Sequence, residues 1–178
     1  MSLIIHYTKG GTFTGIYALT EDGELLSINL NGYDSNTSKY TYALGLSYED
    51  NTTKGFVYGC MDDFLQVTKD DYLRDSSDIQ ANYIVDSNNN KITVKYLFSS
   101  PDNKVYIVTL DDKLYSLTID TSGKYFKYNP AELLNNKTVN DINYDNNNKV
   151  FTVTYTDNTT DKFNVGQYFD ASKTKYGF

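Results

Sequence analysis

The sequence predicts an all-β domain, and its composition, turn chemistry and recurring hairpin patterns support this. Threonine, tyrosine, valine and isoleucine are common, and these residues fit a pleated, half-buried surface. Of the 23 acidic residues, 19 are aspartate, and aspartate favours turns over helices. With 178 residues, we expect one domain spanning residues 1–178, with a core that needs no disulfide or metal.

Two hairpin-like segments match each other without a gap. Residues 16–30 read IYALTEDGELLSINL, and residues 105–119, which lie 89 positions later, read VYIVTLDDKLYSLTI. Each has an acidic turn between two segments rich in apolar residues, which is typical of a β-hairpin. The offset is about two periods of a propeller blade of roughly 45 residues.

Two weaker copies complete a predicted set of four. Residues 146–165 follow the pattern of residues 101–117 at an offset of 45, and residues 55–67, GFVYGCMDDFLQV, give the middle copy. The aromatic anchors of the four copies are separated by 41, 48 and 45 residues, and they are Tyr17, Tyr58, Tyr106 and Phe151. The predicted repeat units are residues 3–39, 40–90, 91–138 and 139–178.

Further strands are predicted on either side of these hairpins. The segments that precede the hairpins are residues 3–7, 40–48, 91–98 and 139–144, and two outer strands follow at 79–85 and 124–128. Connectors rich in Asn and Asp, such as residues 86–90 and 145–148, mark the turns. One short helix is predicted in NPAELLNN, with Asn129 as the N-cap, Pro130 as the first helical residue and Glu132 completing the cap.

Residues 104–128, KVYIVTLDDKLYSLTIDTSGKYFKY, resemble one blade of a β-propeller of the PQQ-like or WD40-like kind. The resemblance rests on the hairpin with its Leu-Tyr-x-Leu strand and on the Thr-Gly-Lys type of turn at residues 121–124. It implies a small four-bladed propeller whose neighbouring blades cover each other. The sequence departs from the blade pattern in two ways, because no tryptophan closes a blade and the hairpin glycine is present only at Gly23. No quinone-binding or other cofactor residue matches, so the resemblance implies no cofactor. A β-sandwich or meander is the alternative fold.

The single histidine and the single cysteine are the first candidates for chemistry. His6 lies in an alternating strand pattern, and no second histidine or Cys/His cluster accompanies it, as a metal site requires. Cys60 needs a base to act as a nucleophile, and His6 is the one imidazole. We therefore predict a strand residue and a buried thiol, and we assign no catalytic, cofactor-binding or metal residue. One cysteine also allows no intrachain disulfide.

Three aspartate pairs are candidates for acid–base chemistry, namely Asp62–Asp63, Asp70–Asp71 and Asp111–Asp112. A glycosidase needs two carboxylates on opposite sides of one bond, whereas adjacent residues of a strand point to opposite faces. The first and third pairs occupy the hairpin turn of their copies, so we predict that the aspartates serve turns. A hydrolase working through aspartate is the enzymatic alternative.

Residues 141–148, DINYDNNN, resemble the first half of a calcium loop. The oxygen-bearing side chains at alternate positions are Asp141, Asn143, Asp145 and Asn147. Asn146 and Thr152 stand where such a loop needs glycine and a bidentate glutamate. The intervening Ile142 and Tyr144 predict a strand, and we assign no metal.

The charge pattern limits the partners. A net charge of −7 with one arginine, Arg74, disfavours binding to nucleic acid. The start, MSLIIHYTKGG, has neither a cationic region nor a long apolar run, so we expect no signal peptide and no membrane span, and a location in a virion or the cytoplasm. Four N-x-[ST] triplets are about as many as chance gives in this composition, and they begin at Asn36, Asn51, Asn136 and Asn158.

These observations predict a non-catalytic structural or protein-interaction protein. The composition, rich in Asn, Asp, Thr and Tyr and poor in Glu and Arg, resembles that of phage tail, fibre and capsid-accessory proteins. The resemblance implies a virion component whose partners are its own copies or other virion proteins. A carbohydrate-binding module that uses some of the 18 tyrosines for stacking on glycans is one alternative. A small acidic inhibitor of a basic groove on a host protein is another.

Overall fold

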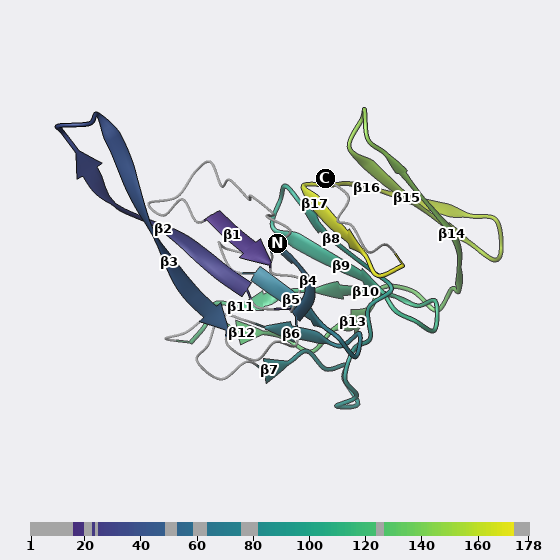
Figure 1. Ribbon diagram of the computed structural model, residues 1–178. Coiled ribbons are helices and arrows are strands. Elements are labelled where there is room, and N and C mark those ends of the chain that lie inside the picture. The colour runs from purple at the N-terminus through teal and green to yellow at the C-terminus, as the bar shows by residue number, and fades with distance from the viewer. Residues whose placement is uncertain are drawn as a thin grey trace. The chain divides into compact units, whose positions relative to one another are not determined.

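The computed structural model describes residues 16–19, 23, 25–48, 53–58, 64–75, 82–123 and 127–172. Every regular element among these residues is a β-strand, which confirms the predicted all-β class (Figure 1). The chain divides into two compact units, Met1–Lys54 and Gly55–Phe178. The boundary falls inside one strand, and each unit has its own antiparallel sheets.

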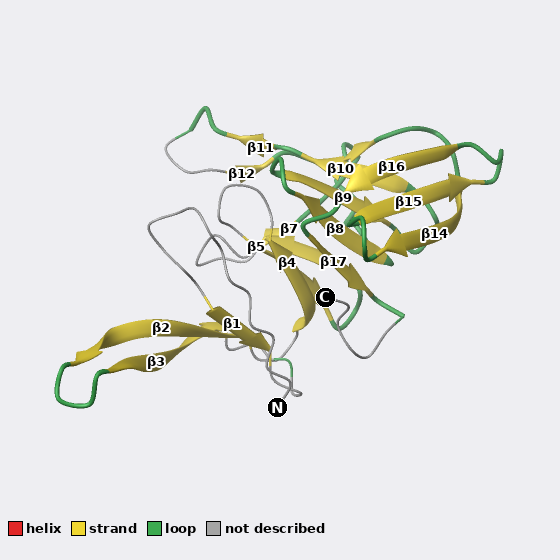
Figure 2. Cartoon of the chain, turned by 90° about the horizontal axis from the view of Figure 1, so that it is seen from above, coloured by secondary structure: helices red, strands yellow, loops and turns green. Residues whose placement is uncertain are grey.

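The first unit contains a three-stranded sheet in the order β1-β2-β3. Its strands are β1 (Ile16–Leu19), β2 (Leu25–Asp34) and β3 (Lys39–Tyr48). β1 pairs only with the first residues of β2, from Leu25 to Ile28, whereas β2 and β3 pair as far as Asp34 and Lys39. The two longer strands therefore continue past β1 as a two-stranded extension, which we call the ribbon (Figures 1 and 2).

The described residues of the second unit form three larger sheets and one small one. The first has the order β4-β5-β6-β7, and its strands are Thr53–Tyr58, Phe64–Thr68, Leu73–Asp75 and Asn82–Tyr83. The second has the order β13-β10-β9-β8-β17, with strands Glu132–Leu133, Leu114–Leu117, Lys104–Val108, Tyr96–Ser100 and Gln167–Asp170. The third is β14-β15-β16 (Val139–Asp145, Val150–Tyr155 and Thr160–Asn164), and β11 (Ile119–Asp120) pairs with β12 (Lys127–Tyr128).

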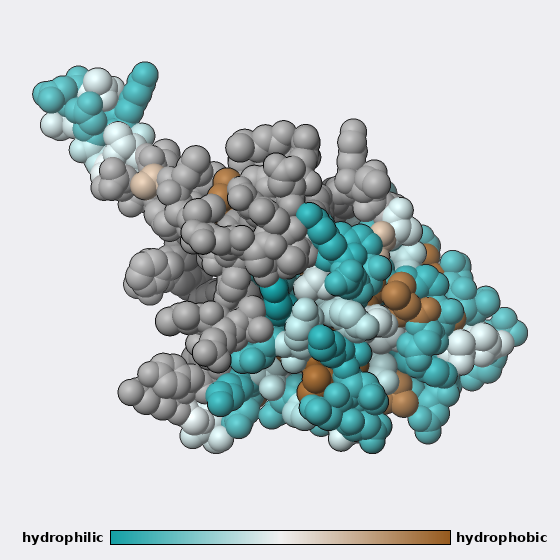
Figure 3. All heavy atoms as spheres, turned by 60° about the horizontal axis from the view of Figure 1, so that its bottom comes forward, coloured by the Kyte–Doolittle hydropathy of each residue, from teal (hydrophilic) through white to brown (hydrophobic). Residues whose placement is uncertain are grey.

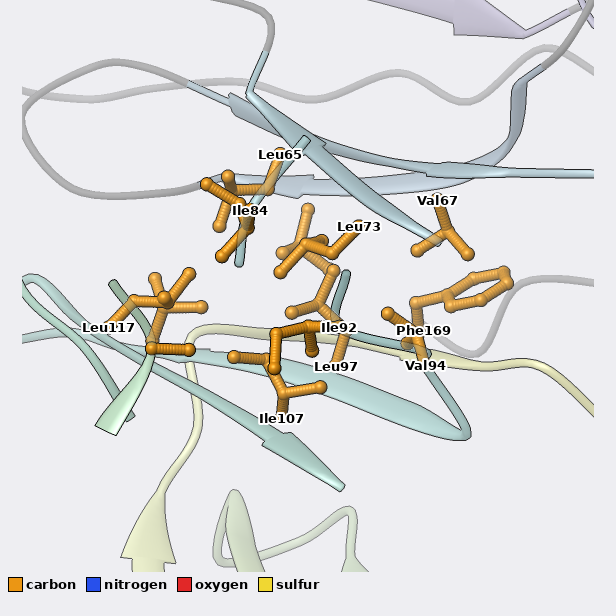
Figure 4. Close-up of a cluster of buried hydrophobic side chains, with 13 residues drawn as sticks. Leu65, Val67, Leu73, Ile84, Ile92, Val94, Leu97, Ile107, Leu117 and Phe169 are labelled. Atoms are coloured by element: carbon orange, nitrogen blue, oxygen red, sulfur yellow. The ribbon is translucent and has the colours of Figure 1, made fainter. Parts of the chain in front are cut away.

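The five-stranded sheet is buried on both faces. On one face, Val105 and Ile107 of β9 join a cluster with residues of the β4–β7 sheet, such as Leu65 and Leu73 (Figure 4). On the other face, Val108 joins a second cluster with residues of β14–β16. Adjacent residues of β9 thus enter different cores, and this explains why VYIV is apolar throughout instead of alternating with polar residues.

The five-stranded sheet of the second unit therefore lies between the other two large sheets, with one apolar cluster on each of its faces. Among the described strands, no sheet closes on itself. The four-bladed propeller remains a prediction, and the structure supports the coarser description of a layered all-β protein.

The predicted helix at residues 129–136 is wrong. β13 occupies Glu132–Leu133 and pairs with β10. The amide of Ala131 donates to the carbonyl of Val85 at 2.7 Å, and the side-chain amide of Asn129 donates to Thr118 Oγ1 at 3.1 Å instead of capping a helix. A helix this short is marginal in water, and neighbouring strands satisfy the backbone of this segment instead.

Most other strand predictions fall close to observed strands. β3 and β14 coincide with the predictions at residues 40–48 and 139–144. The prediction at 91–98 is a strand only from Tyr96 onward. The predicted outer segments contain β7 and β12, and their residues 79–81 and 124–126 lie outside the described residues. The predicted strand at residues 3–7 lies outside the described residues.

Candidate binding surface

The aspartate pairs in the described residues form turns. Asp71 and Asp112 have φ angles of 62° and 59°, in the left-handed region that aspartate tolerates. The amide of Asp71 donates to the carbonyl of Thr68 at 2.9 Å, and that of Asp112 donates to Thr109 at 3.0 Å. In both turns the threonine hydroxyl also accepts the backbone N–H of the residue after the pair. Asp62 and Asp63 lie outside the described residues.

The β5–β6 and β9–β10 hairpins also share their pairing register. Val67 pairs with Leu73 and Val108 with Leu114. The β1–β2 hairpin has the same register, with Leu19 opposite Leu25. The β5–β6 hairpin is therefore the closest equivalent of β9–β10 in the middle of the chain, 41 positions earlier, and it differs from the copy predicted around Tyr58. The signal was present in the sequence, because residues 67–73 read VTKDDYL and residues 108–114 read VTLDDKL.

The carboxylate of Asp112 forms a surface ion pair. Its Oδ1 accepts a hydrogen bond from Lys95 Nζ at 2.7 Å, with about two fifths of each side chain exposed (42% and 37%). This hydrogen bond raises the pKa of Lys95. Because the pair is exposed, it contributes at most about 1 kcal/mol to stability.

The segment that resembles a calcium loop is a strand followed by a turn. Asp141 and Asn143 lie exposed on β14, opposite threonines of β15. Asp145 Oδ1 accepts the backbone N–H groups of Asn147 and Asn148 at 2.9 and 3.1 Å, and its Oδ2 accepts the side-chain amide of Asn148 at 2.7 Å. These bonds, led by the Asn148 side chain, lower the pKa of Asp145. Within the described residues, no group of three or more His, Cys, Asp or Glu side chains could hold a metal ion.

The anchor positions whose side chains are described, Tyr106 and Phe151, belong to an aromatic core. Phe151 is buried and stacks on Phe98 with ring centroids 4.3 Å apart. Tyr106 is half-buried, and its ring centroid lies 4.5 Å from that of Phe163. Burial raises the pKa of the Tyr106 hydroxyl. The side chains of Tyr17 and Tyr58 lie outside the described residues, as do His6 and Cys60.

A buried tyrosine, Tyr155, links two strands through its hydroxyl. Tyr155 O–H donates to Asp161 Oδ2 at 2.6 Å and accepts from Asn135 Nδ2 at 2.9 Å. Burial, together with the hydrogen bond to Asp161, raises the pKa of Tyr155 to about 12. These contacts give the tyrosine a structural role in the β14–β16 sheet.

The one arginine also serves structure. Arg74 is buried on β6, and its Nε and Nη2 both donate to Gln66 Oε1 of β5, at 3.1 and 2.6 Å. Gln66 pairs directly with Arg74 in the sheet. The guanidinium therefore ties two neighbouring strands together within the sheet.

The surface of the second unit offers two further features. Lys91 Nζ lies 3.7 Å from the ring centroid of Tyr83 and 5.2 Å from that of Tyr72, which is a cation–π arrangement. A shallow open groove of about 490 Å³ is lined by Ser87 and by residues 129–133. On the face shown in Figure 3, hydrophobic residues lie singly or in small groups among hydrophilic ones.

The clearest exposed aromatic feature lies on the ribbon of the first unit. Tyr33 of β2 and Tyr40 of β3 pair directly across the ribbon, with ring centroids 5.0 Å apart and planes inclined by 55°. They are 55% and 59% exposed, the largest values among the described tyrosines. The sequence does not distinguish them from the other tyrosines, because exposed and buried strand tyrosines have the same local pattern.

The turn at the end of the ribbon is held by Asp34. Its Oδ1 accepts the backbone N–H of Asn36 at 2.9 Å, and its Oδ2 accepts the Thr37 hydroxyl at 2.8 Å. The Thr37 hydroxyl, followed by the Asn36 N–H, lowers the pKa of Asp34. Ser38, with a φ of 56°, leads the chain back into β3. The tyrosine pair thus lies next to a turn whose own side chains hydrogen-bond to its backbone.

Comparisons of the chain with protein-family models, with curated proteins and with solved structures give no match. No helix long and apolar enough to cross a membrane occurs in the part of the chain that the structure describes.

Proposed function

We propose that this chain is a non-catalytic structural or protein-interaction protein that uses the β2–β3 ribbon as its contact element. The observation that carries the proposal is the exposed tyrosine pair of Tyr33 and Tyr40 on that ribbon. Tyrosine combines a large apolar ring with a polar hydroxyl, and it is enriched among the residues that dominate binding energy at protein interfaces.

The described carboxylates support a non-catalytic role. Asp71, Asp112 and Asp145 belong to turns, and Asp161 accepts the hydroxyl of a buried tyrosine. A general acid of a glycosidase instead faces its partner carboxylate across a cleft and has a raised pKa. The shifts resolved for described aspartates are downward, because the carboxylates accept hydrogen bonds.

The most specific form of the proposal is that the chain is an accessory component of a phage virion. The turn-rich, arginine-poor β composition and the contact ribbon support this form. The test is to sediment purified particles of a phage that encodes the chain and to quantify the chain with an antibody. Co-sedimentation at a fixed number of copies per particle is the expected result, and a chain absent from intact particles would exclude the virion role.

The finer fold proposal is that the hairpins belong to four blades of a small propeller. The identical register of the β1–β2, β5–β6 and β9–β10 hairpins supports it, as do the layered sheets of the second unit. A compact ring of 178 residues should have a radius of gyration of about 16 Å per chain in small-angle scattering. A much larger value for a monomeric sample would reject closure.

Glycan binding is the second candidate, and the same tyrosine pair favours it. Sugar rings stack on exposed aromatic faces, and the ribbon turn adds hydroxyl, amide and carboxylate groups next to Tyr33 and Tyr40. A glycan array is the test, with Tyr33→Ala and Tyr40→Ala as matched variants. Binding that both variants abolish would favour a carbohydrate-binding module. An array on which the parent chain binds no glycan would exclude this function.

A further inference from the structure

In the described part of the second unit, β13 is an outer strand of the five-stranded sheet, and one of its residues has an open backbone (Figure 1). Tyr115 of β10 pairs with Leu133, and the N–H of Leu134 donates to the carbonyl of Leu114 at 2.9 Å. Because the N–H and C=O groups of successive strand residues point to opposite sides, those of Leu133 point away from β10. Leu133 thus presents one donor and one acceptor at the edge of the sheet.

The segment around Val85 covers this edge of β13 over one residue. The N–H of Ala131 donates to the carbonyl of Val85 at 2.7 Å, and Asp86 forms a parallel bridge with Ala131. The chain then turns back, and the N–H of Asp86 donates to the carbonyl of Asn90 at 2.9 Å. Among the described strands and bridges, none continues this pairing at Leu133.

The open groove of about 490 Å³ lies at the same position. Ser87, which follows Asp86 in the chain, lines it together with residues 129–133. The side chain of Leu133 is accessible there, because the residue is 40% exposed. An open strand edge beside a groove can bind an extended segment, whose main chain gives affinity and whose alternate side chains give specificity. β13 has two residues, so the bound segment would be short.

The groove has an acidic rim. Glu132 is exposed, and it is the one charged residue among those that line the groove. Two further carboxylates act on Tyr115, which pairs with Leu133. Burial raises the pKa of Tyr115, and the negative charges of Asp86 and Asp111 raise it further. This end of the sheet therefore favours a segment with basic side chains.

We propose that the open edge of β13 binds an extended segment of a partner protein in which apolar and basic residues alternate. Leu133 and Glu132 are successive strand residues, so their side chains lie on opposite faces of the sheet. A strand paired with Leu133 would place an apolar side chain beside Leu133 and basic side chains on the face of Glu132. We assign the antiparallel direction, because it is the more stable one per residue. The inference goes beyond the proposed function, because the ribbon belongs to the first unit and this edge to the second.

Peptide titration tests the charge pattern. The probe is an acetylated and amidated pentapeptide of alternating valine and lysine, added to the isotope-labelled full chain. The NMR amide signals of Ser87, Ala131 and Leu133 should shift. The matched peptide with glutamate in place of lysine should bind at least about tenfold more weakly, because its charges are repelled by the rim. Glu132→Gln should weaken binding of the valine–lysine peptide about threefold.

N-methylation of the peptide tests the backbone pairing. Methylation of the valines blocks the N–H groups that face β13 in the antiparallel arrangement, and we expect the affinity to fall about tenfold. Methylation of the lysines is the matched control, because their N–H groups point away from β13. Leu133→Pro removes the open N–H without removing a hydrogen bond to β10, and it should weaken binding as strongly as valine methylation. Leu133→Ala keeps that N–H and should have a smaller effect.

A valine–lysine peptide that shifts none of these amide signals would overturn the proposal. Equal affinity for the glutamate peptide, or for the valine-methylated peptide, would do the same. If the same signals shift when the chain alone is concentrated, the occupant is a second copy, and the partner segment is rejected. Tyr33→Ala on the ribbon should leave peptide binding unchanged, so failure of this inference and failure of the proposed function are separate results.

Discussion

The five-stranded sheet of the second unit and the ribbon of the first are built from similar residues but have opposite environments. β8 contains Phe98, which is fully buried between aromatic rings. β2 and β3 contain Tyr33 and Tyr40, which are more than half exposed. Strand propensity is therefore common to both regions. Whether an aromatic residue is buried depends on whether other sheets pack against the faces of its own sheet.

Phe98→Ala should have the largest effect on stability. The side chain is fully buried and packs on Phe151 and Tyr106, so we expect a loss of about 3–5 kcal/mol in the free energy of unfolding. Tyr33→Ala on the ribbon should change it by less than about 0.5 kcal/mol. Urea denaturation of both variants tests the comparison, and equal losses would contradict it.

Gly55→Ala should be the next most harmful change. An added Cβ would lie 2.2 Å from the ring of Phe169, which is buried in the second unit. Overpacking of this kind costs about 1–3 kcal/mol. Gly32→Ala on the ribbon is the matched control, because its nearest neighbour would be Thr41 Oγ1 at 3.7 Å. Thermal unfolding should separate the two variants, and a stable Gly55→Ala protein would show that the ring can move aside.

Tyr155→Phe should cost about 1–2 kcal/mol, because it removes the partner of Asp161 and Asn135 inside the β14–β16 sheet. Its effect should also depend on pH. The folded state holds the pKa of Tyr155 at about 12, against an ordinary value of 10.0. The contribution of this pKa shift to the free energy of unfolding is fully present below pH 10, and it is lost as the pH rises toward 12.

Alkaline unfolding curves of the parent and Tyr155→Phe should therefore converge between pH 10 and pH 12. A constant difference between parent and Tyr155→Phe across this window would contradict the assignment.

Thr159→Ala should have the smallest effect of these variants, and we expect that effect in the pKa of Asp157. The Thr159 hydroxyl, followed by Lys137, holds the pKa of Asp157 at about 2 instead of 3.8. Without that hydroxyl, the pKa of Asp157 should rise toward its ordinary value. An NMR titration of the Asp157 carboxylate measures this pKa directly. An unchanged pKa would mean that Lys137 and the backbone are enough to keep it low.

The sequence predicted the features that depend on local chemistry. The strands β3 and β14 follow from residue pattern, and the turns at Asp71 and Asp112 follow from the ability of aspartate to adopt positive φ. The predicted helix at Asn129 failed because its cap signals are also local, whereas its backbone partners, including Val85, lie far away in the sequence.

The candidate surface was harder to predict from the sequence. Tyr33 and Tyr106 both lie in strands, and their sequence neighbours do not show which of the two is buried. Tyr106 is covered by a second sheet, whereas Tyr33 is exposed. Burial depends on that long-range layering, which a single sequence does not display.

The pairing of β17 with β8 has a consequence for biosynthesis. β17 contributes Phe169 to the core and completes the edge of a sheet whose other strands lie at least 30 residues earlier in the chain. A nascent chain that has emerged only as far as β16 therefore exposes the open backbone of β8 while it waits for the last strand. Ribosome stalling in this interval should promote aggregation, because unpaired strand edges and uncovered apolar surface are the usual starting points of misassembly.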